Sequence, residues 1–408
     1  MIGESNDKRD KIKFSNTNFS INSKENSKVE IFLNKIFIEG INMNASDIHI
    51  ESCGDYFRIR YRVDGILLEK DRYSKDNFLP LVSRIKILCD LDITEKRIPQ
   101  DGRVDGNYRG KDLDFRISVV PAYFGEKVVI RILYKDTAKK TLEELGFDRK
   151  NYSKLFDIIK RKSGMLIISG PMGSGKTTSM YAILNEINSV EKNIVTIEDP
   201  VEYVIEGINQ IQCKNEIGLD FSKILKSILR QDADIIMIGE IRDRETAEIA
   251  IKASLTGHLI LTTLHTKNII SAVKRLINLG IEPFMISAGV KGIQNQRLIR
   301  KLCPYCKVED KNYKEKLEIL GIKNIGFDEK IYTHKGCEKC NFTGYKDRVV
   351  IGEFLYMDNN IEKFITSEIN ISDFENRLKE LGINSLLENG MEFVRKGITS
   401  LDELIREC

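Results

Sequence analysis

The chain has 408 residues, a length typical of two or three domains, and its 41% hydrophobic and 31% charged residues are typical of a globular protein with a sizeable core. The 64 basic and 61 acidic residues leave a net charge of +3 and are interspersed, so the charge gives no indication of nucleic acid as a partner. The sequence contains neither an apolar stretch of about 18 residues that could span a membrane nor the apolar segment of an amino-terminal signal peptide.

The first part of the chain has a polar leader followed by helical and alternating patterns. Residues 1–28 are rich in Asn, Ser and Lys and have no hydrophobic period, so they are predicted to be a flexible leader. Apolar residues then recur at helical spacing from Val29, and the alternating segments 47–51 and 57–63 lead to an Asp-Gly pair typical of a hairpin turn. Further helical or alternating segments follow at 78–91, 112–120 and 127–134. These patterns predict a compact α+β domain over residues 29–135.

A different pattern follows residues 136–146, which are predicted to be a linker. Short apolar runs separated by helical segments occur at 165–169, 194–198, 235–239 and 259–264. Such runs are typical of a parallel sheet covered by helices on both faces. We therefore expect residues 147–408 to form an α/β domain, with a cysteine-containing insert at 300–345 and a helical tail at 358–408.

A phosphate-binding loop is the most specific motif in the sequence. Residues 170–177, GPMGSGKT, fit the pattern G-x-x-x-x-G-K-[ST] between a predicted strand and a predicted helix. The glycines allow backbone N–H groups to surround phosphates, Lys176 neutralises phosphate charge, and the Thr177 hydroxyl can bind Mg²⁺. The sequence therefore predicts binding of ATP and Mg²⁺. The predicted nucleotide contacts are Gly170, Pro171, Met172, Gly173, Ser174, Gly175, Lys176, Thr177 and Thr178.

Ionisable residues follow three other predicted strands. Glu198, Glu240 and His265 each stand where an apolar run ends, and the carboxyl ends of parallel strands meet at one edge of a sheet, where ligands bind. Hydrolysis requires an aligned water as well as bound nucleotide. We expect Glu240 to polarise that water, Glu198 to be a second candidate base, and His265 to lie in the same site.

Other interpretations of these residues remain open. Gly239 stands where the usual Walker B motif has an aspartate, so an indirect magnesium contact is expected. Glu240 could instead cap a helix, and Asp199 is predicted to be structural. His258, at the other end of the strand that leads to His265, could be an ordinary packed residue, and so could His265 itself.

Two Cys-x-x-Cys pairs predict a metal site in the insert. Cys303 and Cys306 are separated by 30 residues from Cys337 and Cys340, and four thiolates can hold Zn²⁺ tetrahedrally in a closed structural site. The alternative is four reduced thiols in a loop. The remaining cysteines are scattered and are predicted to be reduced thiols: Cys53, Cys89, Cys213 and Cys408.

Taken together, these segments resemble the GspE/PilB family, the ATPases of type II secretion and type IV pilus assembly. The resemblance covers roughly residues 45–408 and includes the phosphate loop and the cysteine pairs. Its other motifs are ASDIHIE (45–51), RYRVDG (60–65), RIPQDGR (97–103), TIEDPVE (196–202), GEIRD (239–243) and TGHLILTTLHT (256–266). In this family the Gly-Glu form of the Walker B motif is usual.

The resemblance implies a RecA-like ATPase domain with a smaller, PAS-like amino-terminal domain. It implies a homohexamer at the cytoplasmic face of the membrane, in which ATP hydrolysis moves a membrane platform protein that adds pilin or pseudopilin subunits to a filament. It also implies that arginines of the amino-terminal domain reach the phosphates. Arg116 and Arg131 match, and Arg62 is a weaker candidate. Two alternatives stay open: a regulatory or scaffolding ring with little turnover, and a ring ATPase of DNA uptake or conjugation.

Overall fold

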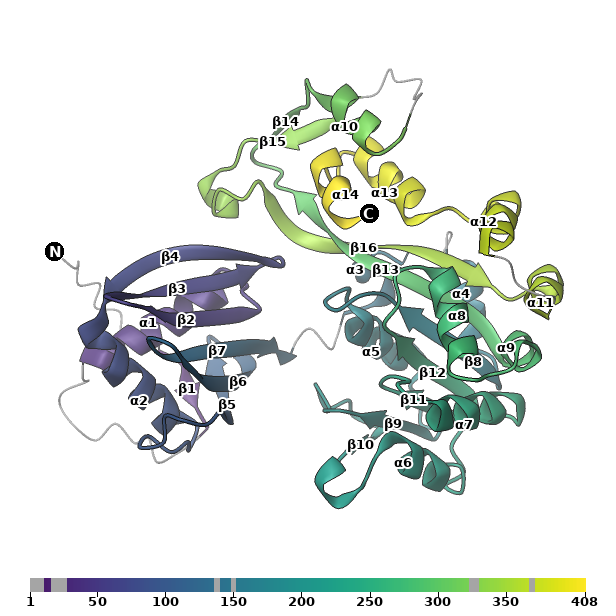
Figure 1. The fold of residues 1–408 in the computed structure, drawn as a ribbon, viewed down its shortest axis with the longest axis horizontal. Coiled ribbons are helices and arrows are strands. Elements are labelled where there is room, and N and C mark those ends of the chain that lie inside the picture. The colour runs from purple at the N-terminus through teal and green to yellow at the C-terminus, as the bar shows by residue number, and fades with distance from the viewer. Residues whose placement is uncertain (1–10, 16–27, 136–139, 148–151, 323–329, 367–370) are drawn as a thin grey trace. The chain divides into compact units, whose positions relative to one another are not determined.

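A computed structural model describes residues 11–15, 28–135, 140–147, 152–322, 330–366 and 371–408. The chain divides into two compact units, residues 1–137 and 138–408 (Figure 1). Most of the predicted leader 1–28 and residues 136–139 of the predicted linker lie outside the described residues.

The first unit contains an antiparallel sheet in the order β1-β5-β6-β7-β2-β3-β4. Along β3, Phe57, Ile59 and Tyr61 are buried, whereas the arginines between them face the other side of the sheet. The buried faces of α1 and α2 belong to the same core as these residues, so both helices cover one face of the sheet. The strands are β1 (Lys13–Phe14), β2 (Asp47–Cys53), β3 (Tyr56–Val63), β4 (Ile66–Ser74), β5 (Gln100–Tyr108), β6 (Lys111–Ala122) and β7 (Gly125–Tyr134), and the helices are α1 (Lys28–Asn42) and α2 (Phe78–Leu88).

Part of the predicted leader is structured. Residues 13 and 14 form β1 on the edge of the sheet beside β5. Ile12 is buried, and the ring of Phe14 lies 5.6 Å from that of Phe37. The prediction of a flexible leader is therefore wrong for residues 11–15, because the short apolar alternation of Ile12 and Phe14 is enough to close the edge of this core.

The Asp-Gly turn joins β3 and β4, as its sequence indicates. Asp64 and Gly65 both have positive φ angles, 47° and 85°. A two-residue hairpin turn of this type needs positive φ at both positions, which Asp and Gly tolerate better than other residues.

The second unit contains a mainly parallel sheet in the order β10-β9-β11-β12-β8-β13-β16, in which only the edge strand β16 is antiparallel to its neighbour. Its strands are β8 (Gly164–Ser169), β9 (Ile194–Glu198), β10 (Asn209–Gln212), β11 (Ile235–Ile238), β12 (Leu259–Leu264), β13 (Val290–Leu302) and β16 (Tyr345–Tyr356). Alternate residues of each central strand enter different cores, as Met165 and Leu166 of β8 do. This is why the predicted runs are apolar without a gap.

Helices cover both faces of this sheet (Figure 1). On one face lie α3 (Leu142–Leu145), α4 (Ser153–Ile158) and α5 (Lys176–Ile187). On the other lie α6 (Phe221–Ile228), α7 (Arg244–Leu255), α8 (Ile269–Asn278) and α9 (Pro283–Gly289). Since α3 falls within residues 136–146 and its Leu142 is buried in the core, that part of the predicted linker belongs to the second unit.

The insert lies between the antiparallel strands β13 and β16, and the tail packs back against them. The insert contains β14 (Lys307–Glu309), α10 (Tyr313–Ile319) and β15 (Tyr332–His334), and the tail contains α11 (Asn359–Thr366), α12 (Ile371–Glu380), α13 (Leu386–Arg395) and α14 (Leu401–Glu407). The Arg300 guanidinium on β13 donates two hydrogen bonds to Glu403 on α14, at 2.9 and 2.6 Å. Among the helices that the structure describes, none is both long and apolar enough to cross a bilayer.

Candidate active site

The phosphate loop connects β8 to α5. Gly170 has a φ of 150°, and a Cβ there would lie 2.5 Å from the carbonyl oxygen of Gln296, so only glycine fits. Gly175 precedes α5 in the left-handed conformation, and no side chain caps this helix. The first N–H groups of α5 are thus left to bind an anion, as expected of a phosphate site.

Lys176 lies inside the loop rather than in solvent. Its ammonium donates to the carbonyl oxygens of Gly170, at 3.0 Å, and Pro171, at 2.9 Å, and lies 3.4 Å from Nδ1 of His265. Burial lowers the pKa of Lys176 to about 8, although the nearby Glu240 acts in the opposite direction. A partly desolvated cation at this position interacts strongly with phosphate oxygens.

Glu240 and His265 meet beside Lys176, as their positions at strand ends predict. Nε2 of His265 lies 3.5 Å from Oε2 of Glu240. The pKa of His265 is lowered by burial and then by the charge of Lys176, so the neutral imidazole is favoured. Arg242 donates to Oε1 of Glu240 and lies 3.5 Å from Asp199. Asp199 therefore has an ion-pairing partner at the edge of the site.

The backbone around Gly239, which precedes Glu240, is closely packed. A Cβ on Gly239 would lie 3.1 Å from the carbonyl oxygen of Ile197 on the adjacent strand, so a side chain there would require a small local shift of this carbonyl. The Thr263 hydroxyl also donates to the Gly239 carbonyl at 2.6 Å. This close strand pairing fixes the backbone that presents Glu240.

Glu198 is held in a buried hydrogen-bond network. Its side chain is 3% exposed and accepts hydrogen bonds from the Thr196 hydroxyl at 2.6 Å, from the Gln210 amide at 3.0 Å and from the Tyr181 hydroxyl. The phenol of Tyr181 in turn accepts a bond from the backbone N–H of Glu202. These contacts orient the segment after β9, and the role of Glu198 as a second base stays a prediction.

The other residues of the predicted site are distributed around the loop. Thr177 and Met172 are exposed, and Thr178 is partly buried on α5. Ser174 donates to the carbonyl of Pro171 at 2.9 Å. His258 lies at the amino end of β12, opposite the end that leads to His265, and its Nδ1 is 3.2 Å from the carbonyl oxygen of Ala253. His258 is therefore not part of the cluster around Lys176.

Two polar residues of β13 support the loop but were not predicted from the sequence. Gln296 is fully buried and donates to the Ser174 carbonyl at 2.8 Å. Asn295 is also buried and accepts a bond from the hydroxyl of Ser169, the last residue of β8, at 3.2 Å. The consecutive polar residues 294–297, between the apolar residues Ile293 and Leu298, were the signal that could have identified them.

The predicted arginines lie in one row across the first unit. Neighbouring strands place Arg103, Arg116, Arg131, Asp47 and Arg62 directly beside one another, on the same face of the sheet. Nε of Arg131 donates to Asp47 at 3.1 Å, and the Arg131 side chain is 60% exposed. Arg103, which was not predicted, donates to Asp114 at 2.8 Å. A row of four arginines that contains one aspartate suits an anionic ligand.

The four predicted cysteines form one cluster. Their sulfur atoms all lie within 4.8 Å of one another. The Sγ–Sγ distances are 3.9 Å for Cys303–Cys337 and 3.8 Å for both Cys306–Cys340 and Cys337–Cys340. Tetrahedral zinc with Zn–S bonds of about 2.3 Å requires sulfur separations of about 3.8 Å, so the cluster fits this ion. Although burial opposes ionisation, backbone N–H groups of Cys337 and Gly344 lower the pKa of Cys340 to about 7.

Comparison with known proteins agrees with this geometry. A family model described as "Type II/IV secretion system protein" matches residues 22–406. The type II secretion system ATPase E of Vibrio cholerae is 42% identical over 392 residues, which are 95% of this chain and 76% of that protein. The type IV pilus assembly ATPase PilB of Myxococcus xanthus is 43% identical over 385 residues, 93% of this chain and 68% of that protein.

Solved structures share the fold. The Legionella pneumophila ATPase DotB has a TM-score of 0.68 at 19% identity, covering 95% of this chain and 98% of that one. The pilus retraction motor PilT, solved with ADP, has a TM-score of 0.62 at 24% identity, covering 94% and 97%. With these neighbours, the predicted α/β, RecA-like fold class is confirmed, including the four-cysteine insert.

Proposed function

Since the chain belongs to the type II/IV secretion system protein family and is an ATPase of that family, we propose that it is the motor of a pilus-assembly or type II secretion machine. It works as a homohexamer that binds a membrane platform protein at the cytoplasmic face of the membrane and not nucleic acid. The relatives named for pilus assembly and for secretion support this role. The interspersed charge of +3 agrees with the absence of nucleic acid as a partner.

The observation that carries the proposal is the contact among Lys176, at the start of α5, and two residues that follow strands, Glu240 after β11 and His265 after β12. His265 lies between the other two, with its imidazole 3.4 Å from the Lys176 ammonium and 3.5 Å from the Glu240 carboxylate. Lys176 and the start of α5 bind the phosphates. Glu240 accepts a proton from the attacking water, and the neutral His265 keeps the carboxylate oriented.

Magnesium and the arginines complete this proposal. Thr177 at the start of α5 would hold Mg²⁺, which supplies positive charge to the phosphate oxygens when bound. Arg116 and Arg131 act on the transferred phosphate when the first unit approaches the nucleotide. The row of arginines in register supports this role.

Zinc is the proposed occupant of the cysteine cluster. The fit of the sulfur separations supports a closed structural site. The cluster joins residues just after β13 to residues just before β16, so a metal there would hold the base of the insert together.

The decisive experiment compares Glu240→Gln with Glu248→Gln, an exposed carboxylate on α7 that pairs with Lys252. Phosphate release by Glu240→Gln should fall at least about tenfold while nucleotide affinity at about pH 7 changes less than about threefold, because the proton acceptor is lost but Lys176 stays largely charged at that pH. Glu248→Gln should match the wild type. Absence of phosphate release from the wild-type chain would contradict the ATPase motor, and unchanged release from Glu240→Gln would contradict the assignment of Glu240.

A further inference from the structure

We propose that Glu353 is a positioning residue for the nucleotide site, which it supports through Asn295 while holding the tail helix α13 to the ATPase core. This inference rests on the proposed function of that site. Glu353 lies on the edge strand β16, outside every motif that the sequence analysis identified.

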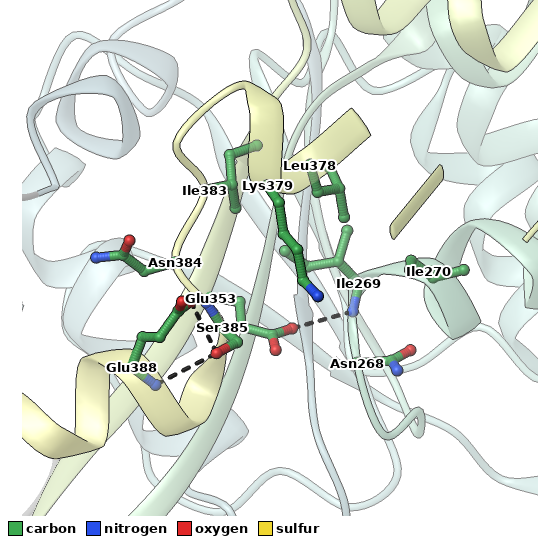
Figure 2. A pocket seen from close by; sticks show the side chains of 10 residues that line it. All are labelled: Asn268, Ile269, Ile270, Glu353, Leu378, Lys379, Ile383, Asn384, Ser385 and Glu388. Atoms are coloured by element: carbon green, nitrogen blue, oxygen red, sulfur yellow. Dashed lines mark hydrogen bonds between the residues drawn. The ribbon is translucent and has the colours of Figure 1, made fainter. Parts of the chain in front are cut away.

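The Glu353 carboxylate joins the beginnings of two helices. Oε1 accepts a hydrogen bond from the N–H of Leu386, the first residue of α13, at 3.1 Å. Oε2 accepts one from the N–H of Ile269, the first residue of α8, at 3.4 Å (Figure 2). The beginning of a helix carries partial positive charge, so one negative group between two such ends stabilises both.

The same carboxylate also reaches the core of the sheet. Nδ2 of Asn295 lies 3.5 Å from Oε2 of Glu353 and donates to the carbonyl oxygen of Lys267 at 3.1 Å. Oδ1 of Asn295 accepts from Ser169, which immediately precedes the phosphate loop. Lys267 is two residues beyond His265. Glu353 and Asn295 therefore fix both the start of the loop and the segment that carries His265.

Glu353 borders a cavity beside an apolar contact between α8 and α12. A cavity of about 210 Å³ separates the start of α8 from α12 and α13, and Glu353 lies on its wall. Figure 2 shows Ile269, Leu378 and Ile383 around the same space. Ile269 and Leu378 belong to one apolar core, with Ile383 packed against it, so apolar contact also joins α8 and α12. The hydrogen bonds of Glu353 add a polar connection between the start of α8 and the start of α13. A shift of α13 would then move the segment after His265.

The test compares Glu353→Gln with Glu388→Gln. Glu388 accepts bonds from the backbone N–H and hydroxyl of Ser385, so it caps the same helix α13, and among the described residues it makes no hydrogen bond to Asn295 or α8. A glutamine at position 353 would direct an NH₂ group at one of the N–H donors, whereas a glutamine at position 388 would disturb only the cap. We expect Glu353→Gln to lower kcat about tenfold with KM within about twofold, and Glu388→Gln to change kcat less than about twofold.

Amide hydrogen exchange gives a readout that does not require turnover. Exchange in residues 266–269 should accelerate in Glu353→Gln but not in Glu388→Gln, because only Glu353 binds the start of α8. An Asn295→Ala chain should show the same kcat loss, and the double variant should lose less than the product of the two effects, since both residues act through one connection. The inference is overturned if Glu353→Gln leaves kcat and exchange at 266–269 unchanged, or if Glu388→Gln reproduces both effects. Wild-type turnover that depends on Glu240 would leave the proposed function intact in that case.

Discussion

The lowered pKa of Lys176 predicts that nucleotide binding weakens at moderately alkaline pH. Binding requires the charged ammonium, and burial within the loop brings its pKa to about 8. An ordinary lysine would keep its proton well beyond that pH. The perturbation is therefore a pH titration of ATP or ADP affinity, with the chain otherwise unaltered.

The expected size follows from the proton equilibrium. With a pKa of about 8, roughly nine-tenths of Lys176 side chains are charged at about pH 7 and roughly one-tenth at about pH 9, so affinity should fall about tenfold over this interval. Stability of the nucleotide-free chain should change with the opposite sign. Burial makes the charged form of Lys176 unfavourable in the folded state but not in the unfolded state. The free energy of unfolding should therefore increase as pH rises from about 8 towards the ordinary lysine pKa.

Fluorescent-nucleotide titrations at a series of pH values measure this effect. Lys176→Arg provides the control, because a guanidinium remains charged throughout the range and removes the pH dependence of this position. Glu240→Gln should move the loss of affinity to lower pH, since the Glu240 charge acts to raise the pKa of Lys176. The reasoning is refuted if wild-type and Lys176→Arg chains have the same profile up to about pH 9.5.

Two further predictions concern the insert and the tail. Metal analysis of protein purified without chelator should find about one zinc per chain. Cys337→Ser should lower the zinc content, whereas Cys53→Ser, outside the cluster, should not. A wild-type content of less than about a fifth of an equivalent would contradict the zinc site. Glu403→Ala should destabilise the second unit by about 3–5 kcal/mol in chemical denaturation because Arg300, only 9% exposed, loses its buried partner. Arg406→Ala removes the more exposed partner of Glu403 and should lower the free energy of unfolding by about 1 kcal/mol. Equal losses of stability in the two variants would contradict the assignment of Arg300 and Glu403 as the critical pair.

The central strands could be predicted because burial on both faces leaves a continuous apolar run. The bounds of β9 and β12 agree with the predicted runs 194–198 and 259–264. The meeting of Glu240 and His265 followed from the same pattern, since parallel strands end at one edge. Local sequence carried this information because Glu240 and His265 each lie within two residues of the end of their own strand.

Residues whose roles depend on distant partners could not be predicted in this way. Glu353 is separated by 84 positions from Ile269 and by 58 from Asn295, and nothing near Glu353 in sequence indicates either contact. Gln296 reaches the phosphate loop across 122 positions. Such contacts exist only once β13 and β16 have joined the sheet. The short strand β1 was missed for a different reason, because two apolar residues are too few to establish a period.

The packing of β11 against its neighbours fixes the backbone that leads to Glu240. Gly239 lies close to the carbonyl oxygen of Ile197 on one side, and its own carbonyl accepts a hydrogen bond from the Thr263 hydroxyl on the other, so a side chain at this position would require a local shift. The next residue points its carboxylate to His265 and Arg242 instead. The acid that follows β11 beside Lys176 is Glu240. Its carboxylate accepts a hydrogen bond from Arg242, two positions later. A carboxylate held between a neutral imidazole and a guanidinium is restricted in its rotamers, and in the proposed mechanism this restriction would help Glu240 to orient the attacking water.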